Sequence, residues 1–340
     1  MFFKKPGDNT LSYIESNDVY DYSIDDLTSE KCFLFAPYDT LNRPIKVFSY
    51  DEKLNNEAIL AYADRLPVLE LQKSEVRTNP NEDSSQIDFM NLVELIKSKI
   101  EIGECQKIIA SRVCNELFRG EVLEGFLQLC DRYNHSFNYL IYISKECYWI
   151  GASPEVLLSC FRNELNTMSL AGTQLVEPGS VYYEWKDKEK FEQQIVTDYI
   201  VAVLESLKLA QLIVSKTHTF QAANLVHLKT DITATISDVN TLIKVLKQLH
   251  PTPAVCGLPK EAAQAFIDLE EMHDRNYYTG FIGEWEGVEN THLFVNLRCA
   301  ELGLDFINYY VGCGITEGSQ AEKEWEETEK KIETLKSVFV

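Results

Sequence analysis

Positively charged side chains are scarce in this sequence. It contains 32 lysine and arginine residues against 53 aspartate and glutamate residues, which gives a formal net charge of -21. A chain with this balance is repelled by nucleic acid and by anionic membrane surfaces, so we expect neither as a partner. An anionic substrate would therefore need local positive charge in its binding site, from a metal ion or from individually placed lysine and arginine side chains.

Paired cysteine motifs are also missing. The nine cysteines are scattered and odd in number, they form no CxxC pair, and several lie in apolar runs. This pattern predicts reduced thiols that pack as small apolar side chains in a cytoplasmic protein. It predicts neither a disulfide framework nor a zinc site.

Long apolar segments are absent as well. No run of 18 apolar residues occurs, and residues 1–10 hold no apolar stretch of signal-peptide length. The 340 residues, 45% of them hydrophobic, can still bury a large core. The most polar segment, residues 73–88, is interpreted as a surface loop and not as a domain boundary. We therefore predict one domain over residues 1–340.

Helical and strand patterns alternate along the chain. Strands are predicted where aromatic and branched residues gather, and they occur in pairs separated by turn residues. Helices are predicted in long separate blocks, with Ser237 or Asp238 as one N-cap and Pro259 in the first turn of another. The expected helices are 86–104, 184–209, 237–250 and 259–273, and the expected strands are 106–114, 136–160 in several pieces, 292–302 and 304–312. This order favours an α+β fold with a mostly antiparallel sheet.

Residues 319–335 are crowded with carboxylates around one tryptophan. Ser319 and Glu322 have the spacing of a capping box, which predicts the start of a helix. On that helix Glu324 and Glu327 share one face, as Glu189 and Glu192 do on the helix expected at 184–209. Such pairs are common on solvated helix faces. Two of them together could also surround a hard cation, because Mg²⁺ prefers oxygen ligands and needs only one or two carboxylates.

Nine segments, in this order, resemble the chorismate-utilising enzymes. They are QKIIASR (106–112), GASPEVLL (151–158), SLAGT (169–173), KDKEKFEQQIV (186–196), LHPTPAVCGLP (249–259), DRNYYTGFIGEWEG (274–287), NLRCAEL (296–302), VGCGITEGS (311–319) and EKEWEETEKK (322–331). The resemblance covers roughly residues 85–340, the expected catalytic core, and nothing is carried over onto residues 1–84. It implies large sheets flanked by helices, a chorismate substrate and a Mg²⁺-dependent site.

The resemblance also implies roles for individual residues. It implies that Glu192 and Glu327 bind the metal, that Glu189 and Glu324 are auxiliary ligands, and that the metal neutralises the ring carboxylate of chorismate. The positions that correspond to substrate contacts in the family are Ala171, Gly172, Thr173, His227, Tyr278, Arg298, Gly312, Gly314 and Lys331. Glycine at positions 312 and 314 lets backbone N–H groups approach an anion closely.

Two further residues indicate the reaction. Lys107 stands where anthranilate and aminodeoxychorismate synthases have glutamine, and a lysine there can act as general base on water. Glu155 resembles the general acid that protonates the departing C4 hydroxyl. Ala171 occupies the position of a nucleophilic lysine in aminodeoxychorismate synthases, which argues against covalent catalysis.

The predicted function is therefore that of an isochorismate synthase, with salicylate synthase and an inactive chorismate-binding paralogue as alternatives. Four residues, Gln193, Ala234, Asn276 and Cys313, depart from the usual family pattern without removing a proposed catalytic group. The resemblance leaves open whether the product enters menaquinone or siderophore biosynthesis, with menaquinone favoured. A monomer is expected.

Overall fold

The computed structural model describes residues 1–16, 18–51, 53–54, 84–118, 121–143, 147–176, 183–222, 225–303 and 306–339. Most of the loop expected at 73–88 lies outside these residues. Within the described parts of the chain, none of the helices combines the length and the apolar character that a transmembrane span requires.

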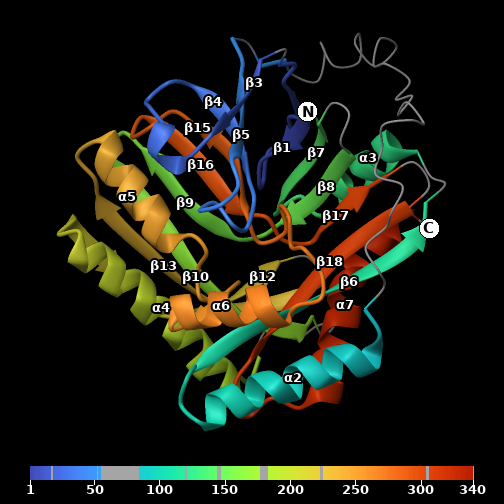
Figure 1. Ribbon diagram of the computed structural model, residues 1–340. Coiled ribbons are helices and arrows are strands. Elements are labelled where there is room, and N and C mark those ends of the chain that lie inside the picture. The colour runs from blue at the N-terminus through green and yellow to red at the C-terminus, as the bar shows by residue number, and fades with distance from the viewer. Residues whose placement is uncertain are drawn as a thin grey trace.

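Two large antiparallel sheets form the centre of the molecule (Figure 1). The first has the order β14 (Gly257–Leu258), β6 (Lys107–Leu117), β18 (Phe306–Ile315), β17 (Cys299–Leu302), β8 (Cys147–Ser153), β7 (Phe137–Ile143), β1 (Phe2–Lys4), β2 (Ser12–Tyr13). The second has the order β11 (Ala210–Val214), β13 (Leu225–Thr235), β10 (Glu164–Leu175), β9 (Val156–Phe161), β16 (Asn290–Val295), β15 (Phe281–Trp285), β4 (Cys32–Ala36), β5 (Ile45–Ser49), β3 (Val19–Tyr22), and β12 (His218–Ala222) also pairs with β13. The predicted α+β class is confirmed.

The helices lie around these sheets. They are α2 (Gln86–Glu101), α3 (Val122–Arg132), α4 (Asp187–Ser206), α5 (Val239–Leu249), α6 (Lys260–Glu270) and α7 (Ala321–Phe339), with a short 3-10 helix, η1 (Ile24–Asp26). Helices α4 and α5 lie beside β9, β10 and β13, whereas α2, α6 and α7 lie along β6 and β18 (Figure 1). The two acidic segments of the sequence therefore belong to α4 and α7.

An aromatic cluster joins the two sheets. Phe137 of the first sheet stacks on Phe294 of the second at 4.4 Å between ring centroids. Phe35 of the second sheet lies edge-on to Trp149 of the first at 6.1 Å. Because such rings bury large apolar areas and prefer these offset and edge-on arrangements, the cluster holds the inner faces of the sheets together.

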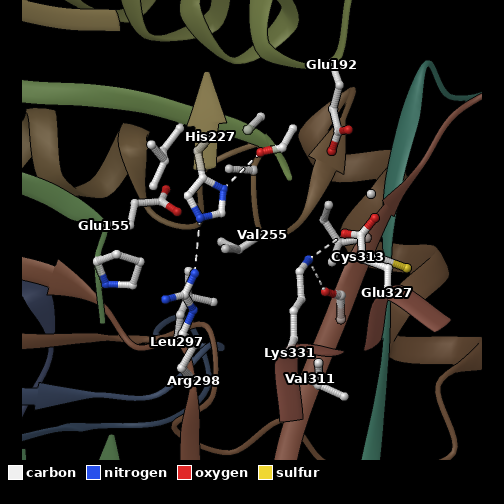
Figure 2. Close-up of a pocket in the computed structure, with 18 of the residues that line it drawn as sticks. Glu155, Glu192, His227, Val255, Leu297, Arg298, Val311, Cys313, Glu327 and Lys331 are labelled. Carbon is white, nitrogen blue, oxygen red and sulfur yellow. Dashed lines mark hydrogen bonds and ion pairs between the residues drawn. The ribbon is translucent and has the colours of Figure 1, made fainter. Parts of the chain in front are cut away.

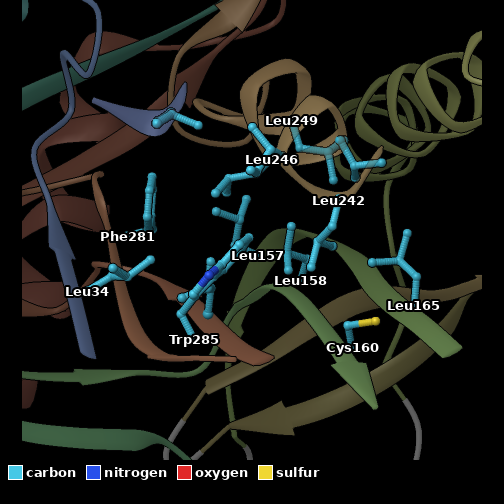
Figure 3. Close-up of a cluster of buried hydrophobic side chains, with 14 of the residues drawn as sticks. Leu34, Leu157, Leu158, Cys160, Leu165, Leu242, Leu246, Leu249, Phe281 and Trp285 are labelled. Atoms are coloured by element: carbon cyan, nitrogen blue, oxygen red, sulfur yellow. The ribbon is translucent and has the colours of Figure 1, made fainter. Parts of the chain in front are cut away.

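The outer face of the second sheet is covered by α4 and α5 (Figure 3). Asp238 begins α5, because its side chain accepts the Thr241 N–H at 2.9 Å. Leu242, Leu246 and Leu249 then follow at helical spacing and are fully buried against the sheet. This apolar stripe is the reason that the segment forms a helix here.

Helix α7 is anchored on β6 through Arg112. The Arg112 guanidinium lies over the Trp325 ring at 3.8 Å and donates through Nε to the Thr328 hydroxyl at 2.8 Å. The predicted helix is present, but it begins at Ala321. The Ser319 hydroxyl accepts the Thr316 N–H at 3.1 Å, so this serine closes the preceding turn in place of the predicted capping box.

The cysteines agree with the reduced state predicted from the sequence. The described side chains are buried and form no disulfide with one another, namely Cys32, Cys105, Cys114, Cys130, Cys160, Cys256, Cys299 and Cys313.

Candidate active site

A pocket lies where α4 and α7 meet the first sheet, and it gathers nearly all residues predicted from the sequence (Figure 2). Its lining includes Lys107, Glu155, Ala171, Gly172, Glu189, Glu192, His227, Tyr278, Arg298, Gly312, Gly314, Glu327 and Lys331. Two predicted residues stand apart. Glu324 does not contribute to the lining, and the Thr173 side chain lies outside the described residues.

Strands β6 and β18 form one wall of the pocket. They pair antiparallel, with Gly312 opposite Ser111 and Gly314 opposite Ile109. A Cβ atom at Gly314 would clash with the Glu192 carboxylate and would lie 2.8 Å from the Lys107 Cε atom. The missing side chain at Gly314 therefore provides the space in which these two side chains meet.

Lys107 lies at the start of β6 and is completely buried. Its Nζ atom is 3.0 Å from Oε1 of Glu192 on α4. This ion pair joins the candidate base to a candidate metal ligand, and it links the first sheet to α4.

Glu155 lies between β8 and β9 and is also buried. Burial raises the pKa of this carboxyl group to about 8, although Lys107, Lys331 and Arg298 act in the opposite direction. Glu155 is therefore largely protonated at neutral pH, which is the state that a general acid requires. In Figure 2 it lies on the opposite side of the pocket from Glu192 and Glu327.

Arg298 and His227 form a pair at the same pocket. Arg298 Nη2 is 3.1 Å from His227 Nε2, and His227 Nδ1 is 2.9 Å from the Gly172 carbonyl oxygen. Burial lowers the pKa of His227 to about 3, with Arg298 as the next cause. Burial also lowers the pKa of Arg298 to about 10. Arg298 Nη1 is buried and has no hydrogen-bond partner within the described residues, so it is available to an anion in the pocket.

Two carboxylates of α7, those of Glu324 and Glu327, contact lysines. Glu327 pairs with Lys331 at 2.8 Å, and Lys331 also donates to the Gly312 carbonyl oxygen at 2.9 Å. Burial alone would raise the pKa of Glu327, but Lys331, Lys188 and Lys107 hold it below its usual value. Glu324 instead pairs with Lys188 of α4 at 2.5 Å. Lys188 lines the pocket, whereas Glu324 does not.

The donor set of the pocket suits a magnesium ion. The described residues contain no group of three or more histidine, cysteine, aspartate or glutamate side chains already arranged to hold a metal. Glu189, Glu192 and Glu327 nevertheless all line the pocket, and they offer the hard carboxylate oxygens that Mg²⁺ prefers. Mg²⁺ needs only one or two carboxylate ligands, so Glu192 and Glu327 are the residues that would hold it. Glu189 accepts the Lys186 N–H at 2.9 Å at the beginning of α4.

Some lining residues were missed by the sequence reasoning. Lys188, Leu170, Ala254, Val255, Leu297 and Tyr310 also face the pocket. Ala254 and Val255 lie in the segment 249–259 that carries part of the resemblance, which is the signal that could have found them. Lys188 directly precedes Glu189, so its place on an acidic helix was visible, but its pairing with α7 was not.

These features agree with the comparisons to known proteins. The chain belongs to the chorismate-binding enzymes, because residues 42–340 match the family model described as "Chorismate binding enzyme". Among curated relatives, it is 28% identical to the isochorismate synthase DhbC of Bacillus subtilis over 265 residues, which cover 73% of this chain and 66% of the relative. It is also 28% identical to the isochorismate synthase MenF of Escherichia coli over 260 residues, or 74% of this chain and 60% of the relative. The chain thus matches somewhat less than two thirds of the length of these two relatives.

Solved structures show the same fold. DhbC from Bacillus anthracis superposes with a TM-score of 0.80 at 21% identity, covering 99% of this chain and 95% of that one. Escherichia coli MenF gives a TM-score of 0.79 at 20% identity, covering 100% of this chain and 88% of that one. At these identities the similarity establishes the fold, and the reaction has to be argued from the site.

Proposed function

We propose that this chain is an isochorismate synthase, which converts chorismate to isochorismate with the help of Mg²⁺. The observation that carries the proposal is the placement of Lys107 and Glu155 at one pocket, both buried, with Glu192 against Lys107 and Glu327 in the same lining. This arrangement offers a base, an acid and a pair of metal-type carboxylates around one space.

Lys107 is proposed as the general base. Its neutral amine form accepts a proton from a water molecule as the water oxygen bonds to C2 of the substrate ring. The ring double bonds then shift, and the bond from C4 to its hydroxyl oxygen breaks. The position of Lys107 supports this role, because its side chain is buried at the pocket, beside Glu192.

Glu155 is proposed as the general acid. Hydroxide is a poor leaving group, so the C4 oxygen needs a proton as it departs. A carboxyl group with a pKa of about 8 carries that proton at neutral pH. One water molecule is consumed at C2 and one is released from C4, so substrate and product are isomers and the atoms balance.

The anionic groups of chorismate are proposed to contact positive groups in the pocket. Arg298 Nη1, the Lys331 ammonium and the backbone near Gly312 and Gly314 are suited to carboxylates. Mg²⁺, held by Glu192 and Glu327, would supply the positive charge that the rest of this acidic chain lacks. Ala171 lines the pocket without a nucleophilic group, which supports a mechanism without a covalent intermediate from that position.

The test is to incubate the purified protein with chorismate, with either Mg²⁺ or EDTA, and to resolve the products by chromatography and mass spectrometry. The proposal expects an isomer of unchanged mass that forms only with Mg²⁺. Release of salicylate and pyruvate would replace the proposal with a salicylate synthase. A folded protein without turnover would replace it with a chorismate-binding paralogue. We further propose that the protein acts in the cytoplasm as a monomer.

A further inference from the structure

The histidine of the pocket has an unusual pair of neighbours. His227 lies in β13 and is buried, and its ring stands between Arg298 and the backbone of β10 (Figure 2). One ring nitrogen, Nδ1, is 2.9 Å from the Gly172 carbonyl oxygen. The other, Nε2, is 3.1 Å from Arg298 Nη2. Both nitrogens are therefore engaged by backbone or side-chain groups of the protein.

These neighbours determine where the proton of the imidazole lies. A carbonyl oxygen can only accept a hydrogen bond, so Nδ1 must carry the hydrogen. A guanidinium group can only donate, so Nε2 must present its lone pair to Arg298. Only the neutral ring with hydrogen on Nδ1 satisfies both contacts.

The surrounding charges favour the same state. Protonation of Nε2 would place a second donor against the guanidinium of Arg298, and Lys331 adds further positive charge nearby. Glu155, the acidic group that interacts with Arg298, is itself largely neutral at pH 7 because burial raises its pKa to about 8. The charged side chains that act on the pKa of His227, Arg298 and Lys331, are both positive, so they disfavour an imidazolium.

We propose that His227 is a positioning residue, which in its neutral tautomer holds the Arg298 guanidinium against the β10 backbone and takes no part in proton transfer. The part of this inference that concerns substrate rests on the proposed function. The imidazole orients Arg298 by engaging Nη2, which leaves Nη1 directed to the pocket anion. Since the Nε2 lone pair is occupied, the ring has no site at which to accept a proton from the substrate.

The backbone on both sides of this contact is specialised. Gly172 has φ +70° in an irregular part of β10, where the register with β13 shifts between Ala171 and Gln174. Arg298 has φ +47°, which is also in the left-handed region that side-chain-bearing residues seldom adopt. A Cβ atom at Gly172 would lie 3.1 Å from the Glu189 Cβ atom. The same bulge therefore contacts α4 and, through His227, sets the position of Arg298.

The tautomer can be measured without turnover. The protein has six histidines, so selective ¹⁵N-histidine labelling gives a spectrum in which His227→Gln identifies the missing signal. We expect Nδ1 to show the shift of a protonated nitrogen and Nε2 that of a lone-pair nitrogen, with no change between about pH 5 and 8, the range in which an ordinary histidine titrates. The reverse tautomer, or a ring that titrates in this range, would overturn the proposal.

Two substitutions separate positioning from proton transfer. Asparagine at 227 can still donate to Gly172 but is too short to reach Arg298, whereas glutamine can place an acceptor near Nη2. We expect His227→Asn to raise KM for chorismate by about ten- to a hundredfold, the effect of losing a hydrogen bond to a charged group, with a much smaller change in kcat. His227→Gln should recover most of that affinity. His218→Gln, an exposed histidine on the neighbouring strand β12, serves as the control.

A proton-transfer role for His227 predicts different results. Both variants would then lose kcat by about 10²- to 10⁴-fold with little change in KM. If the native protein releases salicylate and His227→Gln does not, a purely positioning role is refuted as well. If chorismate is not a substrate at all, the proposed function fails, while the ¹⁵N spectrum still decides the tautomer.

Discussion

Lys107 and Glu192 form an ion pair of 3.0 Å across the interface between β6 and α4. The two residues are 85 positions apart in the chain, and each has a separate proposed role, one as base and one as metal ligand. Their contact is possible because Gly314, on the neighbouring strand, leaves room for both side chains. The pair therefore relates the general base directly to the metal site.

Replacement of Lys107 by glutamine should abolish water addition. The variant keeps a polar side chain of similar length but cannot accept the proton, so we expect kcat to fall by about 10²- to 10⁴-fold. Turnover is followed by chromatography of the products, and Mg²⁺-dependent chorismate binding by calorimetry should persist. The exposed Lys216→Gln is the matched control. Near-normal turnover of the Lys107 variant would refute its assignment as base.

Replacement of Glu327 by alanine should weaken Mg²⁺ binding. Removal of one of two carboxylate ligands should raise the Mg²⁺ concentration for half-maximal activity by tenfold or more, about 1.4 kcal/mol of binding free energy. Glu326 is exposed on the same helix, so Glu326→Ala is the control. If the two variants have the same Mg²⁺ dependence, the acidic face of α7 is only a solvated helix surface.

The pH dependence of turnover should reflect Glu155. Its carboxyl group must be protonated to act, and burial raises its pKa to about 8. We therefore expect kcat to fall about tenfold per pH unit above this value. Glu155→Gln should lack this limb in its residual activity. A native profile that stays flat to pH 10 would contradict the role of Glu155 as acid.

The same group affects stability, and the sign follows from its raised pKa. The folded protein holds the Glu155 proton more tightly than the unfolded chain, so this contribution is fully present below the unfolded pKa of 4.5 and is lost as pH rises to about 8. Glu155→Gln has no such proton to lose. The free energy of unfolding of Glu155→Gln minus that of the native protein should therefore be larger at pH 9 than at pH 5. Urea denaturation of both proteins at the two pH values measures this difference.

Alanine at Gly314 should impair the site while leaving the fold intact. The new Cβ would clash with the Glu192 carboxylate and would lie 2.8 Å from Lys107 Cε, so the ion pair must separate. We expect a loss of activity of at least about tenfold, since small misplacements of reacting groups are costly. A Cβ at Gly318 meets nothing within 4 Å, which makes Gly318→Ala the matched control. Equal activity of the two variants would mean that the ion pair does not matter for turnover.

Local patterns in the sequence predicted the main helices and strands, and the family resemblance predicted most of the candidate site. Asp238 as an N-cap, followed by leucines at helical spacing, specifies α5 because the groups involved are close in the chain. The i,i+3 carboxylates of α4 and α7 were visible for the same reason. The family resemblance then identified Lys107 and Glu155, which no local pattern distinguishes from ordinary lysines and glutamates.

Only the tertiary structure decided which distant side chains meet. Strand order, sheet register and helix docking place Glu192 against Lys107, and they pair Glu324, which does not line the pocket, with Lys188, which does. They also place the Arg298 guanidinium on His227, which determines the tautomer of a ring whose sequence context says nothing about protonation. Sequence by itself thus determined the fold class, every long helix except α3, and the set of chemical groups. Their pairing depends on directions and distances that exist only once the two sheets have packed together.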